Sequence, residues 1–195
     1  WRGEEAAPVG IAVRAEGRDA VNEAFRVLRT NLEFMSQGAG TGNTVMVTSM
    51  NPGSGKTFVT ANLAASLAVK GERVVAVDLD LRRASLSRYV GSPGRGLSGY
   101  LAGQELTAGD ITVEAVGCPG FDIIPVGAIP PNPSELLLSG RLERLLGELR
   151  GRYDRVLLDC PPDGIVADAA IIARQAASTL FVVRAGLMER NMLPE

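Results

Sequence analysis

Apolar residues along the chain form short continuous runs, separated by longer segments in which apolar positions recur every three to four residues. The runs predict buried strands, and the recurring positions predict helices. Strands are expected at residues 44–48, 73–78, 121–125, 155–159 and 179–184, and helices at residues 19–36, 56–70, 134–150 (with Ser134 as N-cap) and 167–177. Alternation of apolar strands with helices is typical of a parallel sheet covered on both faces. We therefore expect an α/β fold with a mostly parallel sheet, covered by helices on both faces, and a ligand site beyond the carboxyl ends of the strands.

The length of 195 residues fits one domain. Residues 1–18 lack clear periodicity, so we interpret them as a leader before a domain at residues 19–195. Because the first residue is Trp1, we expect the sequence to be a piece of a longer protein. No apolar run approaches the roughly 18 residues of a membrane span, and no secretory signal is recognisable at the start.

Composition narrows the possible chemistry. The net charge of −2 gives no basic excess, so nucleic acid is not expected as a partner. The two cysteines are too few for a disulfide framework and fit a reducing cytoplasm. The chain has no histidine, which excludes Ser-His-Asp triads and histidine-ligated zinc. Catalysis would have to use carboxylates, lysine, arginine, backbone amides or a metal bound by oxygen.

Residues 51–57 read N-P-G-S-G-K-T and lie between a predicted strand and a predicted helix, the context of a phosphate-binding loop. Glycines let backbone amides face phosphate oxygens, and the start of the helix adds its dipole. We expect Lys56 to reach the β- and γ-phosphates and the Thr57 hydroxyl to bind Mg²⁺. The usual first glycine of the motif is replaced by Met50, and an ordinary glycine turn is the alternative. The predicted nucleotide-binding residues are Gly53, Ser54, Gly55, Lys56, Thr57 and Phe58.

Three carboxylates follow predicted strands. Asp78 is the last residue of the strand at residues 73–78, and Asp80 follows two positions later. In an extended chain this spacing points both side chains the same way. Asp159 ends the strand at residues 155–159. Carboxylates at adjacent strand ends can hold Mg²⁺, mostly through waters, beside bound phosphates, whereas each one alone could equally cap a turn. We predict Thr57, Asp80 and Asp159 as the metal-binding residues.

Three other charged residues lie after predicted strands. Arg82 and Arg83 could contact phosphates or an acidic substrate, and a surface salt bridge is an equal alternative. Asp168 is interpreted as an acidic residue near the start of its predicted helix.

Together these motifs resemble the deviant-Walker P-loop ATPases, a group that contains partition ATPases, division-site ATPases and bacterial tyrosine kinases. Residues 78–82 (D-L-D-L-R) resemble the Walker A′ motif of the kinases, and residues 127–137 resemble their G-x-x-P-P-N-P-x-E-L-L segment. Residues 23–29 match their E-x2-R-x2-R helix. Partition and division-site ATPases carry a signature lysine where this chain has Asn51. Over roughly residues 15–195 the chain is therefore most similar to the catalytic domain of the bacterial tyrosine kinases (BY-kinases) of the capsule and exopolysaccharide type.

The resemblance implies an ATP- and Mg²⁺-dependent protein-tyrosine kinase that autophosphorylates and controls polymerisation and export of exopolysaccharide or capsule. It implies a cytoplasmic domain, tethered to the inner membrane and activated by a membrane chain-length regulator. Lys56 and Asp78 would be catalytic, with Asp78 accepting the tyrosine proton, because a chain without histidine must use another base. Such kinases continue into a tyrosine-rich tail, so we expect the C-terminal part of the domain to be truncated. The alternatives are a nucleotide-switched dimeric ATPase of the partition or division-site type and a nucleotide-binding scaffold without phosphate transfer.

The first predicted helix carries an apolar stripe formed by Val21, Phe25, Leu28 and Leu32. Glu23, Arg26 and Arg29 form a charged band beside it. Such a band is usually a solvated face, but the resemblance implies that it joins subunits into a homo-oligomeric ring. Because the stripe already faces the core, we expect the band to make no contacts within its own chain.

Overall fold

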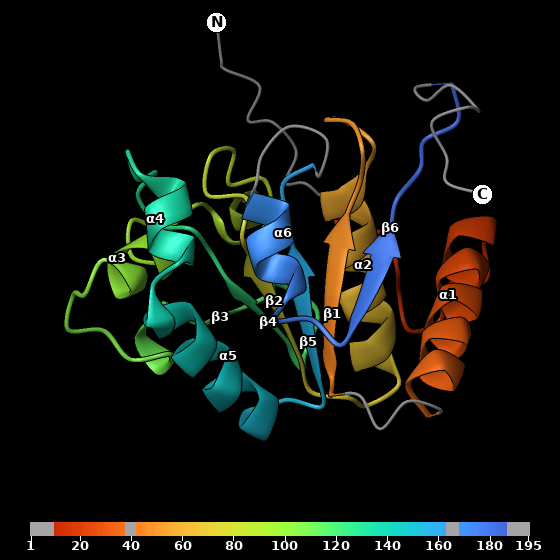
Figure 1. Cartoon of the computed structure of the whole chain (residues 1–195). Coiled ribbons are helices and arrows are strands. Elements are labelled where there is room, and N and C mark those ends of the chain that lie inside the picture. The colour runs from red at the N-terminus through yellow and green to blue at the C-terminus, as the bar shows by residue number, and fades with distance from the viewer. Residues whose placement is uncertain (1–9, 38–41, 163–167, 187–195) are drawn as a thin grey trace, which may run out of the picture.

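In the computed structural model, which describes residues 10–37, 42–162 and 168–186, a central sheet separates two layers of helices (Figure 1). The strand order in the described part is β3-β4-β2-β5-β1-β6. Neighbouring strands run parallel, apart from the antiparallel pair β3 and β4. The strands are β1 (Thr44–Thr48), β2 (Val74–Asp78), β3 (Val113–Glu114), β4 (Phe121–Ile124), β5 (Arg155–Asp159) and β6 (Ser178–Phe181). The expected α/β fold with a mostly parallel sheet is confirmed.

The helices cover both faces of the sheet, with α2 behind it and α5 and α6 in front of it in Figure 1. The longer helices are α1 (Ala20–Gln37), α2 (Lys56–Val69) and α5 (Gly140–Arg152). The shorter ones are α3 (Leu97–Leu101), α4 (Pro133–Leu137), α6 (Asp168–Ala173) and the 3₁₀ turns η1 (Leu86–Val90) and η2 (Gly109–Ile111). None of the helices in the described ranges is both long enough and apolar enough to cross a bilayer.

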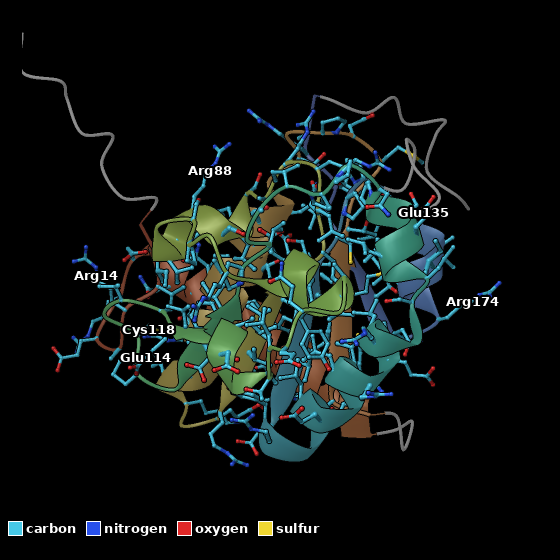
Figure 2. All side chains as sticks on the ribbon, turned by 90° about the vertical axis from the view of Figure 1, so that its left-hand side faces the viewer. Arg14, Arg88, Glu114, Cys118, Glu135 and Arg174 are labelled. Atoms are coloured by element: carbon cyan, nitrogen blue, oxygen red, sulfur yellow. The ribbon has the colours of Figure 1, made fainter. Side chains whose placement is uncertain are left out.

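Alternate residues of β2 enter two separate cores, which explains why this strand is apolar up to its last residue, Asp78. Val74 and Ala76 pack in the cluster that contains the buried face of α2. Val75 and Val77 pack in the cluster formed with α3, α5 and α6. A strand buried on both faces needs apolar side chains at every position. Charged side chains such as Arg88 and Arg174 project from the outside of the molecule (Figure 2).

Several element bounds match those expected from the sequence, but one predicted helix is wrong. The strands at residues 44–48 and 155–159 are confirmed with the same limits. The helix expected over residues 134–150 is divided into α4 and α5, because Ser139 adopts an extended conformation between them. The Ser139 hydroxyl donates to Leu136 O at 2.6 Å and closes the last turn of α4. The N-cap position of α4 is Asn132 and not Ser134.

The described residues just before α1 pack against α2. The backbone amides of Ala12 and Val13 donate to Asn62 Oδ1 at 2.8 and 3.0 Å. The amide of Arg14 donates to Asn22 Oδ1 at 2.8 Å, and the Val13 side chain is buried. Part of the segment that we interpreted as a leader is therefore fixed to the domain, and its Val13 belongs to the core beside α2.

A close backbone crossing holds the loop after β4 against the start of α3. The amides of Leu97 and Ser98 donate to the carbonyls of Pro125 and Val126 at 2.8 and 2.9 Å. A Cβ atom built on Gly96 would lie 2.4 Å from both Gly127 N and Pro125 O. Only glycine fits this crossing without a backbone shift.

We predict that Gly96→Ala lowers the free energy of unfolding by about 1–3 kcal/mol, the usual cost of overpacking a closely packed site. Urea denaturation would measure the loss. Gly94→Ala is the matched control, because a Cβ atom at Gly94 meets no atom within 4 Å, and its effect should stay within about 0.5 kcal/mol. Equal stability of the two variants would contradict the prediction.

Candidate functional site

The predicted phosphate loop connects β1 with α2 and is folded by its glycines and by serine hydroxyls. Gly53 and Gly55 have φ angles of 75° and 94°, which L side chains rarely adopt. The hydroxyls of Ser49 and Ser54 donate to the carbonyl of Asn51 at 2.9 and 2.8 Å. These contacts hold the loop in a turn immediately before the first residue of α2, where free backbone amides face outward from a helix start.

Arg184 gives this loop a further contact. Its Nη1 donates to Gly53 O at 3.0 Å, so the segment after β6 is joined to the loop after β1. The two residues are 131 positions apart in the sequence. No sequence motif indicates Arg184, and only the neighbouring positions of β1 and β6 in the sheet bring it to the loop.

Asp159 joins the end of β5 to the first turns of α2. Thr57 Oγ1 donates to Asp159 Oδ2 at 2.7 Å, and Thr60 Oγ1 donates to Asp159 Oδ1 at 3.2 Å. Burial raises the pKa of Asp159 to about 6, while the Thr57 hydrogen bond and the charge of Lys56 oppose this shift. Thr60 was not predicted from the sequence, although it lies one helical turn after Thr57 and so on the same side of α2.

Asp78 lies directly opposite Asp159 in the parallel pair of β2 and β5. Asp78 Oδ2 accepts from the backbone amide and from the hydroxyl of Ser87, both at 2.8 Å. Asp78 Oδ1 is buried and has no hydrogen-bond partner among the described residues. Burial raises the pKa of Asp78 to about 8, and the negative charge of Asp159 adds to the shift.

Ser87 was not predicted as a site residue. Its hydroxyl accepts from the amide of Val126 at 2.8 Å while donating to Asp78. The serine therefore joins η1, the end of β2 and the segment after β4. No pattern in the sequence distinguishes it from other serines, because both of its partners are distant in the chain.

Asp80 lies in a turn after β2 and is almost fully buried. Its Oδ1 accepts from the amide of Arg83 at 3.2 Å. The described residues contain no group of three or more His, Cys, Asp and Glu side chains arranged to hold a metal. The predicted ligand set depends instead on the Thr57 hydroxyl and on water between the carboxylates and the ion.

A divalent cation fits the chemistry of this site. Asp78, Asp80 and Asp159 are all buried at this end of the sheet, and the buried Lys56 acts by its charge on Asp159. Asp78 Oδ1 has no partner among the described residues, and burial, with the charge of Asp159 added, raises the pKa of Asp78. A hard cation with oxygen ligands and water would offset the negative charge of these carboxylates.

Phe58, also predicted to bind the nucleotide, lies in the first turn of α2. Its ring packs edge-on against Phe25 of α1, with the ring centroids 6.0 Å apart. The other predicted nucleotide and metal residues lie together at the carboxyl ends of β1, β2 and β5. The predicted interface residues lie apart from them, on α1.

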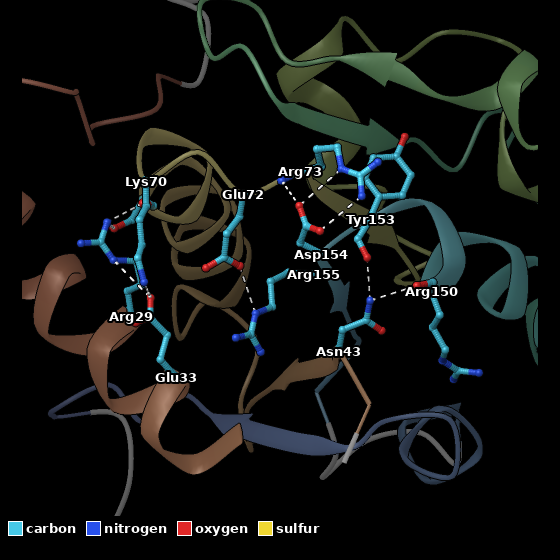
Figure 3. Close-up of polar contacts among 11 residues, drawn as sticks. Arg29, Glu33, Asn43, Lys70, Glu72, Arg73, Arg150, Tyr153, Asp154 and Arg155 are labelled. Carbon is cyan, nitrogen blue, oxygen red and sulfur yellow. Dashed lines mark hydrogen bonds and ion pairs between the residues drawn. The ribbon is translucent and has the colours of Figure 1, made fainter. Parts of the chain in front are cut away.

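The expectation that the charged band of α1 makes no contacts within its own chain is wrong. Arg29 Nη1 donates to Ser66 O at 2.7 Å, and Arg29 lies beside Glu33, which pairs with Lys70 at 2.7 Å (Figure 3). Arg26 Nη2 donates to the carbonyl of Gly17. The reason is that α1 packs along α2, so long side chains at the edge of the apolar stripe reach neighbouring carbonyls. Glu23 remains exposed and pairs with Arg26 at 3.1 Å.

The apolar stripe of α1 also differs in one position from the expectation. Phe25 and Leu32 are buried and Leu28 packs beside them, whereas Val21 is exposed at 41%. In the first turn of α1 the buried position is instead Asn22, whose Oδ1 accepts from the amide of Arg14.

Comparison with known proteins identifies the family. Residues 45–175 match the family described as CobQ/CobB/MinD/ParA nucleotide binding domain. Tyrosine-protein kinase Etk of Escherichia coli (strain K12) is 42% identical over 170 residues, which are 87% of this chain and 23% of Etk. Tyrosine-protein kinase Wzc of Salmonella typhimurium is 44% identical over 167 residues, 85% of this chain and 23% of Wzc. The chain thus spans less than a quarter of the length of these relatives.

Solved structures extend the likeness to the fold. The kinase domain of Escherichia coli tyrosine kinase Etk matches with a TM-score of 0.81 and 40% identity, over 86% of this chain and 65% of that one. The BceF tyrosine kinase domain matches with a TM-score of 0.78 and 42% identity, over 87% and 67%. The cell division ATPase MinD of Pyrococcus furiosus matches with a TM-score of 0.62 and 32% identity, over 72% and 59%.

The resemblance stated from the sequence motifs is confirmed by these matches, and the kinase domains are more similar to this chain than MinD in both identity and fold. Taken with the phosphate loop and the carboxylates at the strand ends, they show that the chain belongs to the CobQ/CobB/MinD/ParA family of nucleotide-binding domains and, within that family, to the catalytic domains of the bacterial tyrosine kinases.

Proposed function

We propose that this chain is the ATP-binding catalytic domain of a protein-tyrosine kinase. One observation carries the proposal. The hydroxyl of Thr57, in the phosphate-loop motif, donates a hydrogen bond to Asp159, and Asp159 lies opposite Asp78 in the sheet. Asp78 Oδ1 has no partner among the described residues. This arrangement puts a carboxylate with a free oxygen beside the place where phosphates would bind. The names of the relatives, tyrosine-protein kinases Etk and Wzc, supply the reaction class.

The proposed roles follow from these positions. Backbone amides of residues 53–58 would bind phosphate oxygens, and Lys56 would balance the charge of the β- and γ-phosphates. Thr57 would bind Mg²⁺ directly, with Asp80 and Asp159 holding it through water. When bound, the ion would neutralise charge on the phosphates.

In the reaction, the tyrosine oxygen attacks the γ-phosphorus of ATP, and the bond from that phosphorus to the β,γ-bridging oxygen breaks, so that ADP leaves. The phenolic proton goes to Asp78, whose Oδ2 is held by Ser87 and whose Oδ1 is free to receive it. The protein contributes mainly by positioning the reactants and stabilising charge.

The proposed setting is control of exopolysaccharide or capsule export, as the likeness to kinases of that type suggests. The domain would work at the cytoplasmic face of the bacterial inner membrane. Its activator would be a membrane chain-length regulator, either in the same chain or as a separate protein. These points rest on the family alone, since the chain spans less than a quarter of its named relatives.

We expect Lys56→Ala to lower tyrosine phosphorylation by about 100-fold or more, because one charge-stabilising group at a reacting centre commonly contributes that much. Transfer of radiolabelled phosphate from ATP to a tyrosine-containing peptide would measure it. Lys70→Ala is the matched control. Lys70 lies at the end of α2 opposite to Lys56 and pairs with Glu33 of α1. Phosphorylation that survives in Lys56→Ala would refute the assigned role.

The same assay separates the alternatives. Release of ADP without phosphotyrosine would favour a nucleotide-switched ATPase, the class whose signature lysine is replaced here by Asn51. Nucleotide binding without release of ADP would favour a scaffold.

Mg²⁺ and ADP together are expected to raise the melting temperature of the chain. A ligand at 100 times its dissociation constant adds about 2.7 kcal/mol to the free energy of unfolding. Asp159→Asn should lose most of the Mg²⁺-dependent part of this shift. Its Oδ1 can still accept from one of the two threonine hydroxyls, and its Nδ2 can donate to the other. Asp154→Asn, which changes a carboxylate at the start of β5, should keep the full shift. An identical Mg²⁺ effect in both variants would exclude Asp159 from the metal site.

We also propose that the charged band on α1 contributes to a ring of subunits. Glu23 is exposed and Arg26 is half-exposed with one contact to Gly17 O, whereas Arg29 is held against α2. Arginine and carboxylate side chains form directional pairs that suit a head-to-tail contact.

Replacing both Glu23 and Arg26 with alanine should lower the molecular mass in light scattering and leave ADP affinity unchanged. Arg29→Ala should instead lower thermal stability, because it removes the hydrogen bond to Ser66 O. If the double variant assembles like the parent chain, the pair is only a solvated helix face.

A further inference from the structure

Arg82, Ser134 and Asp168 form a small network that is termed the clasp here. Arg82 Nε and Nη2 each lie 3.2 Å from Asp168 Oδ2. Ser134 Oγ donates to Asp168 Oδ1 at 2.6 Å and accepts from Arg82 Nη2 at 3.2 Å. Every pair of side chains in the clasp is therefore in direct contact.

The three members come from segments that follow three different strands. Arg82 follows β2, Ser134 lies in α4 after β4, and Asp168 begins α6 after β5. The hydrogen bonds of the sheet end before these segments, so side chains have to set their relative positions. The clasp is a contact of this kind, and it lies at the carboxyl edge of the sheet, where the phosphate loop also lies.

The carboxylate of Asp168 is buried, so its hydrogen bonds have to come from the protein. The side chain of Asp168 is 3% exposed, whereas that of Arg82 is 45% exposed. A buried carboxylate needs its charged partner and its remaining hydrogen bonds, because water cannot replace them. The planar fork of arginine supplies two donors in a fixed geometry, which lysine lacks. The carboxylate therefore holds the guanidinium in one orientation.

Arg82 also belongs to the turn that carries Asp80. The amides of Arg83 and Ala84 donate to Asp80 O at 3.1 and 2.9 Å. The amide of Arg83 donates in addition to Asp80 Oδ1 at 3.2 Å. A displacement of Arg82 would move the neighbouring amide that orients the Asp80 carboxylate.

We propose that the clasp sets the position of the Asp80 carboxylate toward Mg²⁺, with Arg82 as a positioning residue that itself touches neither metal nor nucleotide. The inference rests on the proposed function of the site as a place for a nucleotide and Mg²⁺. It also gives Ser134, within the proline-rich segment at residues 127–137, a role in the site.

The test compares ADP binding with Mg²⁺ and with EDTA by calorimetry, in Arg82→Ala and in Asp168→Asn. Partners that orient a metal ligand commonly contribute about 10-fold or more to metal affinity. We therefore expect about 10-fold weaker binding in the presence of Mg²⁺ and unchanged binding in EDTA. Arg82→Lys keeps the charge without the fork, so it should recover only part of the loss.

The matched control is Arg73→Ala. Arg73 and Asp154 lie just before β2 and β5, at the end of the sheet opposite to the phosphate loop. Arg73 Nη2 pairs with Asp154 Oδ1 at 3.3 Å (Figure 3). This variant also breaks an arginine–aspartate pair between two segments, but away from the site. Its affinity for ADP with Mg²⁺ should equal that of the parent chain.

Three results would overturn the inference. The first is an equal loss of ADP affinity with Mg²⁺ and in EDTA, which would mean general damage. The second is an equal loss in Arg73→Ala. The third is additive loss in a variant that combines Arg82→Ala with Asp168→Asn, because members of one network should not act independently.

The parent chain distinguishes this inference from the proposed function. If the parent chain binds ADP no more tightly with Mg²⁺ than in EDTA, the proposed function fails and the inference fails with it. If the parent chain shows the gain and the clasp variants retain it, only the inference fails.

Discussion

The parallel pairing of β2 with β5 is the constraint on which the site depends. Its register sets Asp78 directly opposite Asp159, and the pairing of β5 with β1 brings the phosphate loop alongside. The carboxyl ends of parallel strands meet at one edge, so residues from distant parts of the chain gather there without any local contact. A shift of one residue in either pairing would turn these side chains to other faces of the sheet.

This pairing also creates an electrostatic problem. Carboxylates on adjacent strands repel one another, and burial removes the water that would screen them. The raised pKa values of Asp78 and Asp159 are the result. Lys56 and the hydroxyls of Thr57 and Thr60 offset only part of the cost, since Asp78 Oδ1 stays unpaired among the described residues. A site of this kind favours binding of a cation, which is consistent with the proposed use of Mg²⁺.

Beyond the sheet, side chains hold the loops in place. Ser87 connects Asp78 to the amide of Val126, and Arg184 connects the segment after β6 to Gly53. The clasp connects the turn after β2 to α4 and α6. The predicted site residues thus lie at the ends of β2 and β5, at the start of α2 and in the adjoining loops, while the doubly covered sheet supplies the rigid base. Each connection joins segments that follow different strands, which explains why loops without regular structure can hold a defined geometry.

The sequence alone determined the features that depend on neighbouring residues. Continuous apolar runs predicted the strands, since a strand buried on both faces is apolar at its central positions. β1 and β5 have the expected limits. The glycines and the lysine of the phosphate loop, and the aspartates at strand ends, were recognisable because their chemistry depends on short spacing. The likeness to the bacterial tyrosine kinases followed from those same motifs.

The tertiary structure decided everything that depends on contacts between distant segments. The break between α4 and α5, the bonds of Ser87 and Arg184, and the contact of Arg29 with α2 have no local pattern in the sequence. The sequence left the role of Arg82 open between phosphate contact and salt bridge, and the tertiary structure pairs it with the buried Asp168. The physical reason is that hydrogen bonds and ion pairs require partners within about 3 Å, and only the packed sheet and its loops determine which residues come that close.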